Sequence, residues 1–266
     1  MDIQVTRDIW SSAAALESYM GRWSRLVARE FVRWLAVPPD QTWLDVGCGT
    51  GALTETLFET ASPRYIVGVD SSNAYVDFLR HHLTDLRLCF DIGDVQDLHF
   101  YDEFYDNTVA ALALHLAPDP RRGVAEMARV TKAEGTVAAY VWDYAGEMQM
   151  IRYFWNAAGE LDPAARKLDE GAQFGICKPE PLGELFRAAG LKDVATRAID
   201  VPTTFRDFDD YWNPFLNGQE PAPSYIISLS EEHRAALREK IRAALPIARD
   251  GSIPLIARAW AVRGTR

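Results

Sequence analysis

The chain has 266 residues, of which 48% are hydrophobic, and it carries a formal net charge of −10. Its length lies at the upper end of what one domain holds, and its apolar content suffices for a sizeable core. A strongly acidic surface repels phosphate backbones and anionic lipid, which disfavours nucleic acid and membranes as partners.

We expect neither a targeting segment nor a membrane span. The N-terminal stretch MDIQVTRDIW has acids early and lacks an apolar core of signal-peptide length. No apolar run approaches the roughly 18 residues that a membrane span needs. Cys48, Cys89 and Cys177 are scattered and form no CxxC pair, which disfavours a disulfide framework or a metal site. These features suit a cytoplasmic protein without a bound metal.

Strands and helices are predicted to alternate over the first half of the chain. Apolar residues from Trp23 to Leu35 recur at helical spacing and predict an amphipathic helix before the main sheet. Alternation after it is typical of a mainly parallel, doubly wound sheet. We expect buried strands at 42–46, 65–69, 86–92, 108–112 and 136–142, with helices at 52–58, 73–82 and 120–130 between them.

The pattern changes after Trp142, where an aromatic-rich stretch without strand patterning begins. A helix then follows, with Pro181 near its start and Gly190 as its C-terminal stop. The remaining elements are expected to be strands at 194–201 and 255–262 and, between them, an aromatic cluster and a charged helix from about 230 to 245.

The expected fold is an α/β domain built on a doubly wound, Rossmann-like, seven-stranded, mostly parallel sheet. One domain, 1–266, accounts for the whole chain, because no linker separates its parts cleanly. We divide it into an N-terminal helical segment (1–40), the main sheet core (41–142), two insertions forming a helical and aromatic lid (143–180 and 202–252), and the C-terminal part of the core (181–201 and 253–266).

The strongest local signal is the run LDVGCGTG, which contains Gly47, Gly49 and Gly51. An apolar strand leads directly into a glycine turn and then a helix. In open α/β sheets, ligands bind where such turns leave the carboxyl ends of the strands. Glycine lets the backbone approach a ligand closely. The spacing G-x-G-x-G differs from the G-x-G-x-x-G of dinucleotide-binding folds.

Acidic residues follow the next two predicted strands. Asp70 ends the run VGVD and precedes Ser71, and a carboxylate there can accept both hydroxyls of a ribose. Asp94 follows the third strand and can accept from an adenine amino group, while Val95 packs against the ring. Three sites after three successive strands therefore match three parts of one adenosyl ligand.

The motifs LDVGCGTG, VGVDSS and GDVQDLHF, in this order, resemble those of class I S-adenosylmethionine-dependent methyltransferases, in particular the ubiquinone/menaquinone-type branch that acts on small molecules. The resemblance covers most of 42–142. It implies S-adenosyl-L-methionine as cofactor, a small-molecule methyl acceptor and in-line methyl transfer, mainly through proximity and orientation. It also implies that the glycines contact the methionine part, Asp70 and Ser71 the ribose, and Asp94 and Val95 the adenine.

Other residues in and around these motifs have alternative interpretations. Asp45 either orients the turn and contacts the cofactor's ammonium through water, or only caps backbone amides. Cys48 lies in the turn and is expected to be a packed side chain, since no base is evident beside it. Arg22 can pair with the cofactor carboxylate and Tyr19 can cover the sulfonium, although an ordinary amphipathic helix explains them equally.

His115 follows the fourth predicted strand, where the resembling family lines its methyl-transfer site. It is the candidate catalytic residue, because a histidine can deprotonate an acceptor near neutral pH. A structural or lining role is slightly favoured over that of a base.

Rival functions fit the sequence less well. A nicotinamide-dependent oxidoreductase shares the glycine turn and Asp70 but does not account for Asp94. An amino-type nucleic-acid methyltransferase needs a D/N/S-P-P-Y/F/W segment where this chain has ALHLAPDP. A non-catalytic, regulatory S-adenosylmethionine-binding protein is compatible with the sequence, but such a protein has no need of a lid over the acceptor side.

Overall fold

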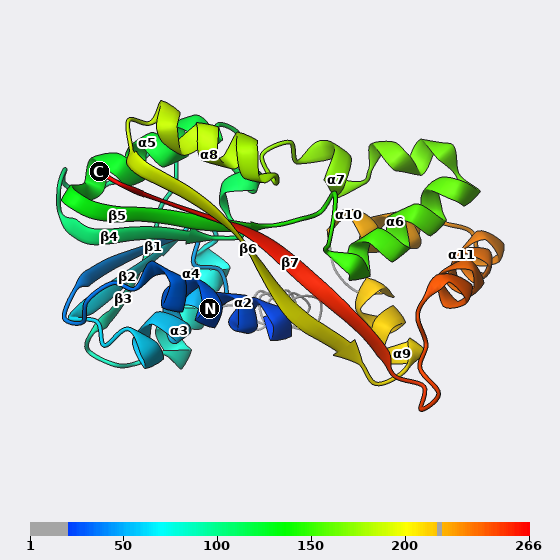
Figure 1. The fold of residues 1–266 in the computed structure, drawn as a ribbon. Helices are drawn as coiled ribbons and strands as arrows, with labels where there is room; N and C mark the ends of the chain where they lie inside the picture. Colours follow the sequence, from blue (N-terminus) through cyan, green and yellow to red (C-terminus); the bar gives the residue numbers. More distant parts are fainter. Residues whose placement is uncertain (1–20, 217–219) are drawn as a thin grey trace.

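The central element of the structure is a twisted sheet. The computed structural model describes residues 21–216 and 220–266. Seven strands follow the order β3-β2-β1-β4-β5-β7-β6 across the sheet (Figure 1). They are β1 (Thr42–Val46), β2 (Tyr65–Asp70), β3 (Leu88–Ile92), β4 (Tyr105–Ala111), β5 (Thr131–Trp142), β6 (Lys192–Phe205) and β7 (Ile253–Thr265).

The strand directions confirm the predicted fold class. β1 to β5 are parallel to one another. β7 is antiparallel to both of its neighbours, β5 and β6, so β6 points the same way as the parallel strands. The strand order reverses between β1 and β4, and the loops that leave these two strands diverge at their carboxyl ends. The sheet is therefore doubly wound, seven-stranded and mostly parallel, as expected.

Helices cover both faces of the sheet. α2 (Arg22–Leu35), α3 (Ala52–Thr60) and α4 (Asn73–His82) lie on one face, and α5 (Pro120–Val130) and α8 (Pro179–Ala188) on the other (Figure 1). Helices on both faces explain why β1 is buried at every position rather than at alternate ones. None of the described helices is both long and apolar enough to cross a membrane.

Capping residues set the boundaries of two of these helices. The Ser72 hydroxyl accepts a hydrogen bond from a backbone N–H in the first turn of α4. The Asp119 carboxylate accepts from two N–H groups of α5, where Pro120 occupies the first helical position. Both helices span the residues predicted for them, because these signals are local.

The last two strands are longer than predicted. Expected at 194–201 and 255–262, they remain paired as far as Phe205, which lies opposite Ile253. From 199 to 205, buried and exposed residues alternate along β6, so polar residues interrupt its apolar pattern. The resulting two-stranded ribbon projects beyond the other strands and reaches a group of helices (Figure 1).

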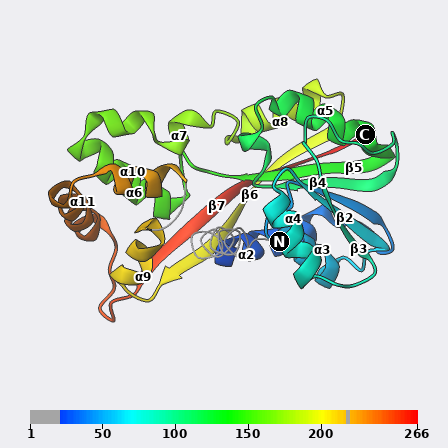
Figure 2. The same ribbon diagram turned by 180° about the vertical axis from the view of Figure 1, so that it is seen from behind.

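These helices form the lid, and both insertions contribute to it (Figure 2). Phe154 of the first insertion stacks on Phe215 of the second, with ring centroids 4.8 Å apart. Much of the aromatic cluster therefore forms the lid's own core. The predicted domain boundaries stay a prediction. The lid helices are α6 (Gln149–Leu161), α7 (Glu170–Gln173), α9 (Phe208–Trp212), α10 (Pro221–Ser228) and α11 (Glu231–Ala244).

Candidate cofactor and acceptor site

A cavity of about 540 Å³ lies at the carboxyl ends of the parallel strands, between the sheet and the lid. The turns after β1, β2 and β3 form one side of it, and the segments after β4 and β5 form the other. Gly21 and Ser24 at the start of α2 also line it, as do Glu170 and Phe174 from the lid. The cavity thus has a sheet-side half and a lid-side half.

The glycine turn follows β1 and needs its glycines for different reasons. Gly47, Gly49 and Gly51 have φ values of 71°, 52° and 93°, which L side chains rarely adopt. A Cβ on Gly47 would lie 2.3 Å from the Cβ of Ala113, whereas a Cβ on Gly49 would meet no atom within 4 Å. Gly47 and Gly49 line the cavity, while Gly51 starts α3 and a Cβ there would meet Leu79.

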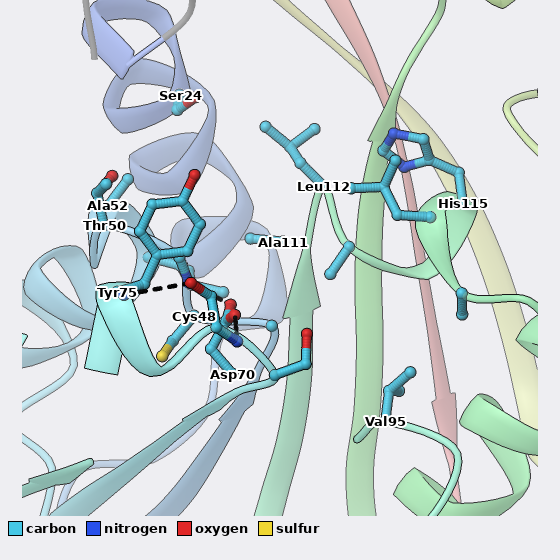
Figure 3. A pocket seen from close by; sticks show the side chains of 18 of the residues that line it. Ser24, Cys48, Thr50, Ala52, Asp70, Tyr75, Val95, Ala111, Leu112 and His115 are labelled. Atoms are coloured by element: carbon cyan, nitrogen blue, oxygen red, sulfur yellow. Dashed lines mark hydrogen bonds between the residues drawn. The ribbon is translucent and has the colours of Figure 1, made fainter. Parts of the chain in front are cut away.

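Asp70 ties the glycine turn to the turn after β2. One carboxylate oxygen accepts from the backbone N–H of Gly49 at 2.9 Å, and the other from the N–H of Ser72 at 2.8 Å. A carboxylate has about four acceptor positions, so each oxygen can accept one further hydrogen bond. Asp70 and Ser71 both line the cavity, and Figure 3 shows Asp70 on its sheet side.

Asp94 and Val95 line the cavity next to this group, as predicted for an adenine subsite. The carboxylate of Asp94 already accepts hydrogen bonds from Gln96, through its backbone N–H at 2.8 Å and its side-chain amide at 3.3 Å. These bonds hold the turn after β3 in place. The role of Asp94 toward adenine stays a prediction.

Two other motif residues, Asp45 and Cys48, have mainly packing roles around the turn. Asp45 is fully buried, accepts from the Thr54 hydroxyl at 2.6 Å and is absent from the cavity wall that the described residues form. Burial raises the pKa of this carboxyl to about 7. Cys48 lines the cavity but packs with Val76, Leu79 and Phe90, and burial raises the pKa of its thiol well above normal. Such a thiol is unreactive.

The N-terminal candidates are placed only in part. Tyr19 lies outside the described residues, and Arg22 is described only by its backbone, as the first residue of α2. The same helix brings Ser24 to the cavity, while its Trp23 packs edge-on against Phe205 of β6 at 5.1 Å. The start of α2 therefore closes one end of the cavity.

His115 lies on the opposite side of the cavity from Asp70 (Figure 3). It belongs to a 3₁₀ turn, Leu114–Leu116, that begins two residues after Leu112, whose positive φ of 56° is strained for a leucine. The imidazole packs against two rings, with centroid distances of 4.8 Å to Phe174 and 5.5 Å to Tyr144. Its Nδ1 atom is buried and has no hydrogen-bond partner among the described residues. Burial lowers the pKa of His115 to about 4.

Several lining residues were not foreseen as site residues. They are Ser24, Tyr75, Glu170, Phe174 and Glu220. Tyr75 follows the cap of α4 by three residues, and this proximity to Asp70 was the one local signal available. Glu170, Phe174 and Glu220 reach the cavity only because the lid folds over the sheet.

Among the described residues that line the cavity, the charged side chains are all acidic. They belong to Asp70 and Asp94 on the sheet side and to Glu170 and Glu220 on the lid side. Neither lysine nor arginine occurs among the described lining residues. A cavity of this kind attracts cations and repels anions. The described residues also contain no group of three or more histidine, cysteine or acidic side chains that could hold a metal ion.

The comparison with protein families agrees with this geometry. Residues 44–139, which include β1, the glycine turn, Asp70 and Asp94, match a family described as a methyltransferase domain. This core of the chain is therefore a methyltransferase domain. The sheet order, the glycine turn and the acidic residues thus agree with the family match.

Relatives of this methyltransferase include enzymes that act on quinones. It is 29% identical over 181 residues to demethylmenaquinone methyltransferase of Roseiflexus sp. strain RS-1, covering 63% of this chain and 75% of that protein. It is 26% identical over 238 residues to 2-methyl-6-phytyl-1,4-hydroquinone methyltransferase of Synechocystis sp., covering 80% and 73%. A putative methyltransferase from Bacillus halodurans shares its fold, with a TM-score of 0.59, 15% identity and coverage of 90% and 97%.

Proposed function

We propose that the methyltransferase binds S-adenosylmethionine on the sheet side of the cavity and methylates a small, planar and largely apolar acceptor on the lid side. The observation that carries this proposal is that one cavity contains both the glycine turn with Asp70 and the aromatic wall around His115. A cavity with two such halves suits two reactants better than the single ligand of a regulatory protein.

The cofactor is proposed to lie across the turns after β1, β2 and β3. Gly47 and Gly49 leave room for the methionine part, because Gly49 has open space where a side chain would begin. The free acceptor positions of Asp70 suit the two ribose hydroxyls, with Ser71 beside them. Asp94 and Val95 are then left for the adenine.

The acceptor is proposed to lie between the rings on the lid side. Trp142, Tyr144 and Phe174 line this half of the cavity and favour a planar apolar molecule. The hydroquinone- and menaquinone-related names of the relatives support the same class of acceptor. The acidic lining and the lack of a described membrane-spanning helix are compatible with a small diffusing substrate and a cytoplasmic site of action.

The reaction is proposed to proceed by in-line displacement at an already activated methyl group. The enzyme then contributes mainly by holding the two reactants in line and by excluding water. At neutral pH a half-buried, uncharged His115 provides a hydrogen-bonding group in the wall rather than a strong base.

Calorimetric titration with S-adenosylmethionine, S-adenosylhomocysteine and NAD tests this proposal. We expect micromolar binding of the two adenosyl ligands and no binding of NAD. Binding of NAD alone would replace the methyltransferase proposal with that of a nicotinamide-dependent enzyme.

A further inference from the structure

Glu170 brings a buried carboxyl group to the lid side of the cavity. It is the first residue of α7, lines the cavity and is only 2% exposed. One carboxyl oxygen accepts a hydrogen bond from the indole Nε1 of Trp155, which is itself buried on α6. A carboxyl group buried this deeply is costly to ionise, so its position facing a cavity calls for an explanation.

The groups around Glu170 connect it to the His115 side of the cavity. Burial raises the pKa of the Tyr144 phenol well above normal, and the nearby carboxylate of Glu170 contributes to this rise. The Tyr144 hydroxyl in turn lies 3.5 Å from Nε2 of His115. On the other flank, Asp169 and Arg152 form an ion pair with each other. Glu170 therefore belongs to the polar groups that surround the acceptor half.

Glu170 is better suited than His115 to take up a proton at neutral pH. Burial raises the pKa of the Glu170 carboxyl to about 7, with a smaller rise from Asp169 opposed by Arg152. Burial lowers the pKa of His115 to about 4, so the imidazole binds a proton only weakly at neutral pH. A bound sulfonium in the same cavity would favour the ionised form of Glu170.

The charge of the lining limits which acceptors fit. Glu170 and Glu220 flank the lid side, and no described lining residue is a lysine or an arginine. A carboxylate or phosphate on the acceptor would meet no lysine or arginine among the described lining residues, and an ionised Glu170 would repel it.

We infer that Glu170 accepts the proton that the methyl acceptor loses, and that this acceptor carries an O–H or N–H group and no anionic group. The inference rests on the proposed function. The acceptor's O–H or N–H bond breaks and the proton moves to a carboxylate oxygen of Glu170. The electron pair left behind forms a bond to the methyl carbon. The C–S bond breaks with its pair on sulfur, which leaves neutral S-adenosylhomocysteine.

A binding experiment tests Glu170 without knowledge of the acceptor. Sinefungin carries an amino group where S-adenosylmethionine has the transferable methyl, so its ammonium should point toward the acceptor half. Once Glu170 ionises, it attracts this ammonium but not the neutral thioether of S-adenosylhomocysteine. We expect the preference for sinefungin over S-adenosylhomocysteine to rise about threefold or more from pH 6 to pH 8. Ionisation of Asp45 affects the amino-acid part common to both ligands and therefore cancels in the ratio.

Glu170→Gln should abolish this rise, because the amide still accepts from Trp155 but does not titrate. The matched control is Glu160→Gln, which replaces an exposed acid of α6 that pairs with Lys240. It should leave the rise unchanged. If S-adenosylhomocysteine binds but the rise is absent, or persists in Glu170→Gln, Glu170 is not the proton acceptor. If S-adenosylhomocysteine does not bind at all, the proposed function itself fails.

The acceptor class is tested with a matched pair of compounds, 1,4-dihydroxynaphthalene and its 2-carboxylate. We expect the complex with S-adenosylhomocysteine to bind the neutral compound at least tenfold more tightly, on the order of a like-charge penalty of 1.4 kcal/mol. Tighter binding of the carboxylate would overturn the inference that the acceptor lacks an anionic group.

Discussion

The carboxylate of Asp70 accepts a hydrogen bond at 2.9 Å from the backbone N–H of Gly49, which lies 21 residues earlier in the chain. This bond joins the end of β2 to the turn after β1. The residue proposed to hold the ribose therefore also shapes the turn proposed to hold the methionine part. Loss of Asp70 should affect both parts of the cofactor site.

Asp70→Ala should weaken the binding of S-adenosylhomocysteine by about 2 kcal/mol, or roughly 30-fold, because it removes charged acceptors from the cavity. Calorimetry measures the affinity, and a thermal melt checks that the variant is folded. Asp85→Ala, at an acid that pairs with Arg87 outside the cavity, is the control and should bind normally. Wild-type affinity in Asp70→Ala would show that the ribose lies elsewhere.

Gly47→Ala should lower the free energy of unfolding by about 1–3 kcal/mol, because the added methyl overlaps Ala113 and the backbone has a positive φ. Gly49→Ala is the matched comparison: its φ is also positive, but its methyl meets no atom within 4 Å. It should cost about 1 kcal/mol and instead interfere with cofactor binding. Denaturant unfolding measures both, and Ala113→Gly should restore part of the stability of Gly47→Ala. Equal costs for the two variants would contradict this account.

The sequence was sufficient where structure depends on local chemistry. Helices 73–82 and 120–130 were predicted to the residue, because Ser72 and Asp119 cap them. The glycine turn, Asp70 and Asp94 were likewise placed at one edge of the sheet, because parallel strands bring their carboxyl ends together. Gly51 and Asp45 share the motif but lie outside the cavity wall of the described residues, since the same run must also start α3 and fill the core.

The residues on the lid side of the cavity could not be predicted from the sequence in this way. Glu170 lies in a four-residue helix with no recognisable motif, and it shares a cavity with His115 only through the packing of the lid over the sheet. The extension of β6 to Phe205 was missed because its exposed polar residues interrupt the apolar run. Contacts between segments far apart in the sequence leave no spacing pattern to recognise.

Asp45→Asn should change how stability depends on pH. The folded-state pKa of about 7 lies above the ordinary aspartate value of 3.8, so between these values the folded state holds a proton that the unfolded chain has lost. Stability from this group is therefore complete below about pH 4 and is lost as the pH rises to 7. We expect Asp45→Asn to gain stability relative to wild type from pH 5 to pH 8, on the order of 1 kcal/mol or more. Urea unfolding at both pH values measures the difference, and a constant difference would mean that Asp45 is ionised throughout.

His115 should remain uncharged well below neutral pH, because burial lowers its pKa to about 4 and no described acid stabilises the positive charge of a protonated ring. Heteronuclear NMR of the imidazole rings measures this directly, with His115→Gln identifying the signal. The unfolded chain takes up its proton near pH 6.5, so the stability due to His115 is present above that pH and is lost as the pH falls toward 4. His115→Gln should therefore become less destabilising, relative to wild type, as the pH falls over this range. Protonation of His115 near pH 6.5 in the folded protein would instead restore the histidine as a candidate general base, in competition with Glu170.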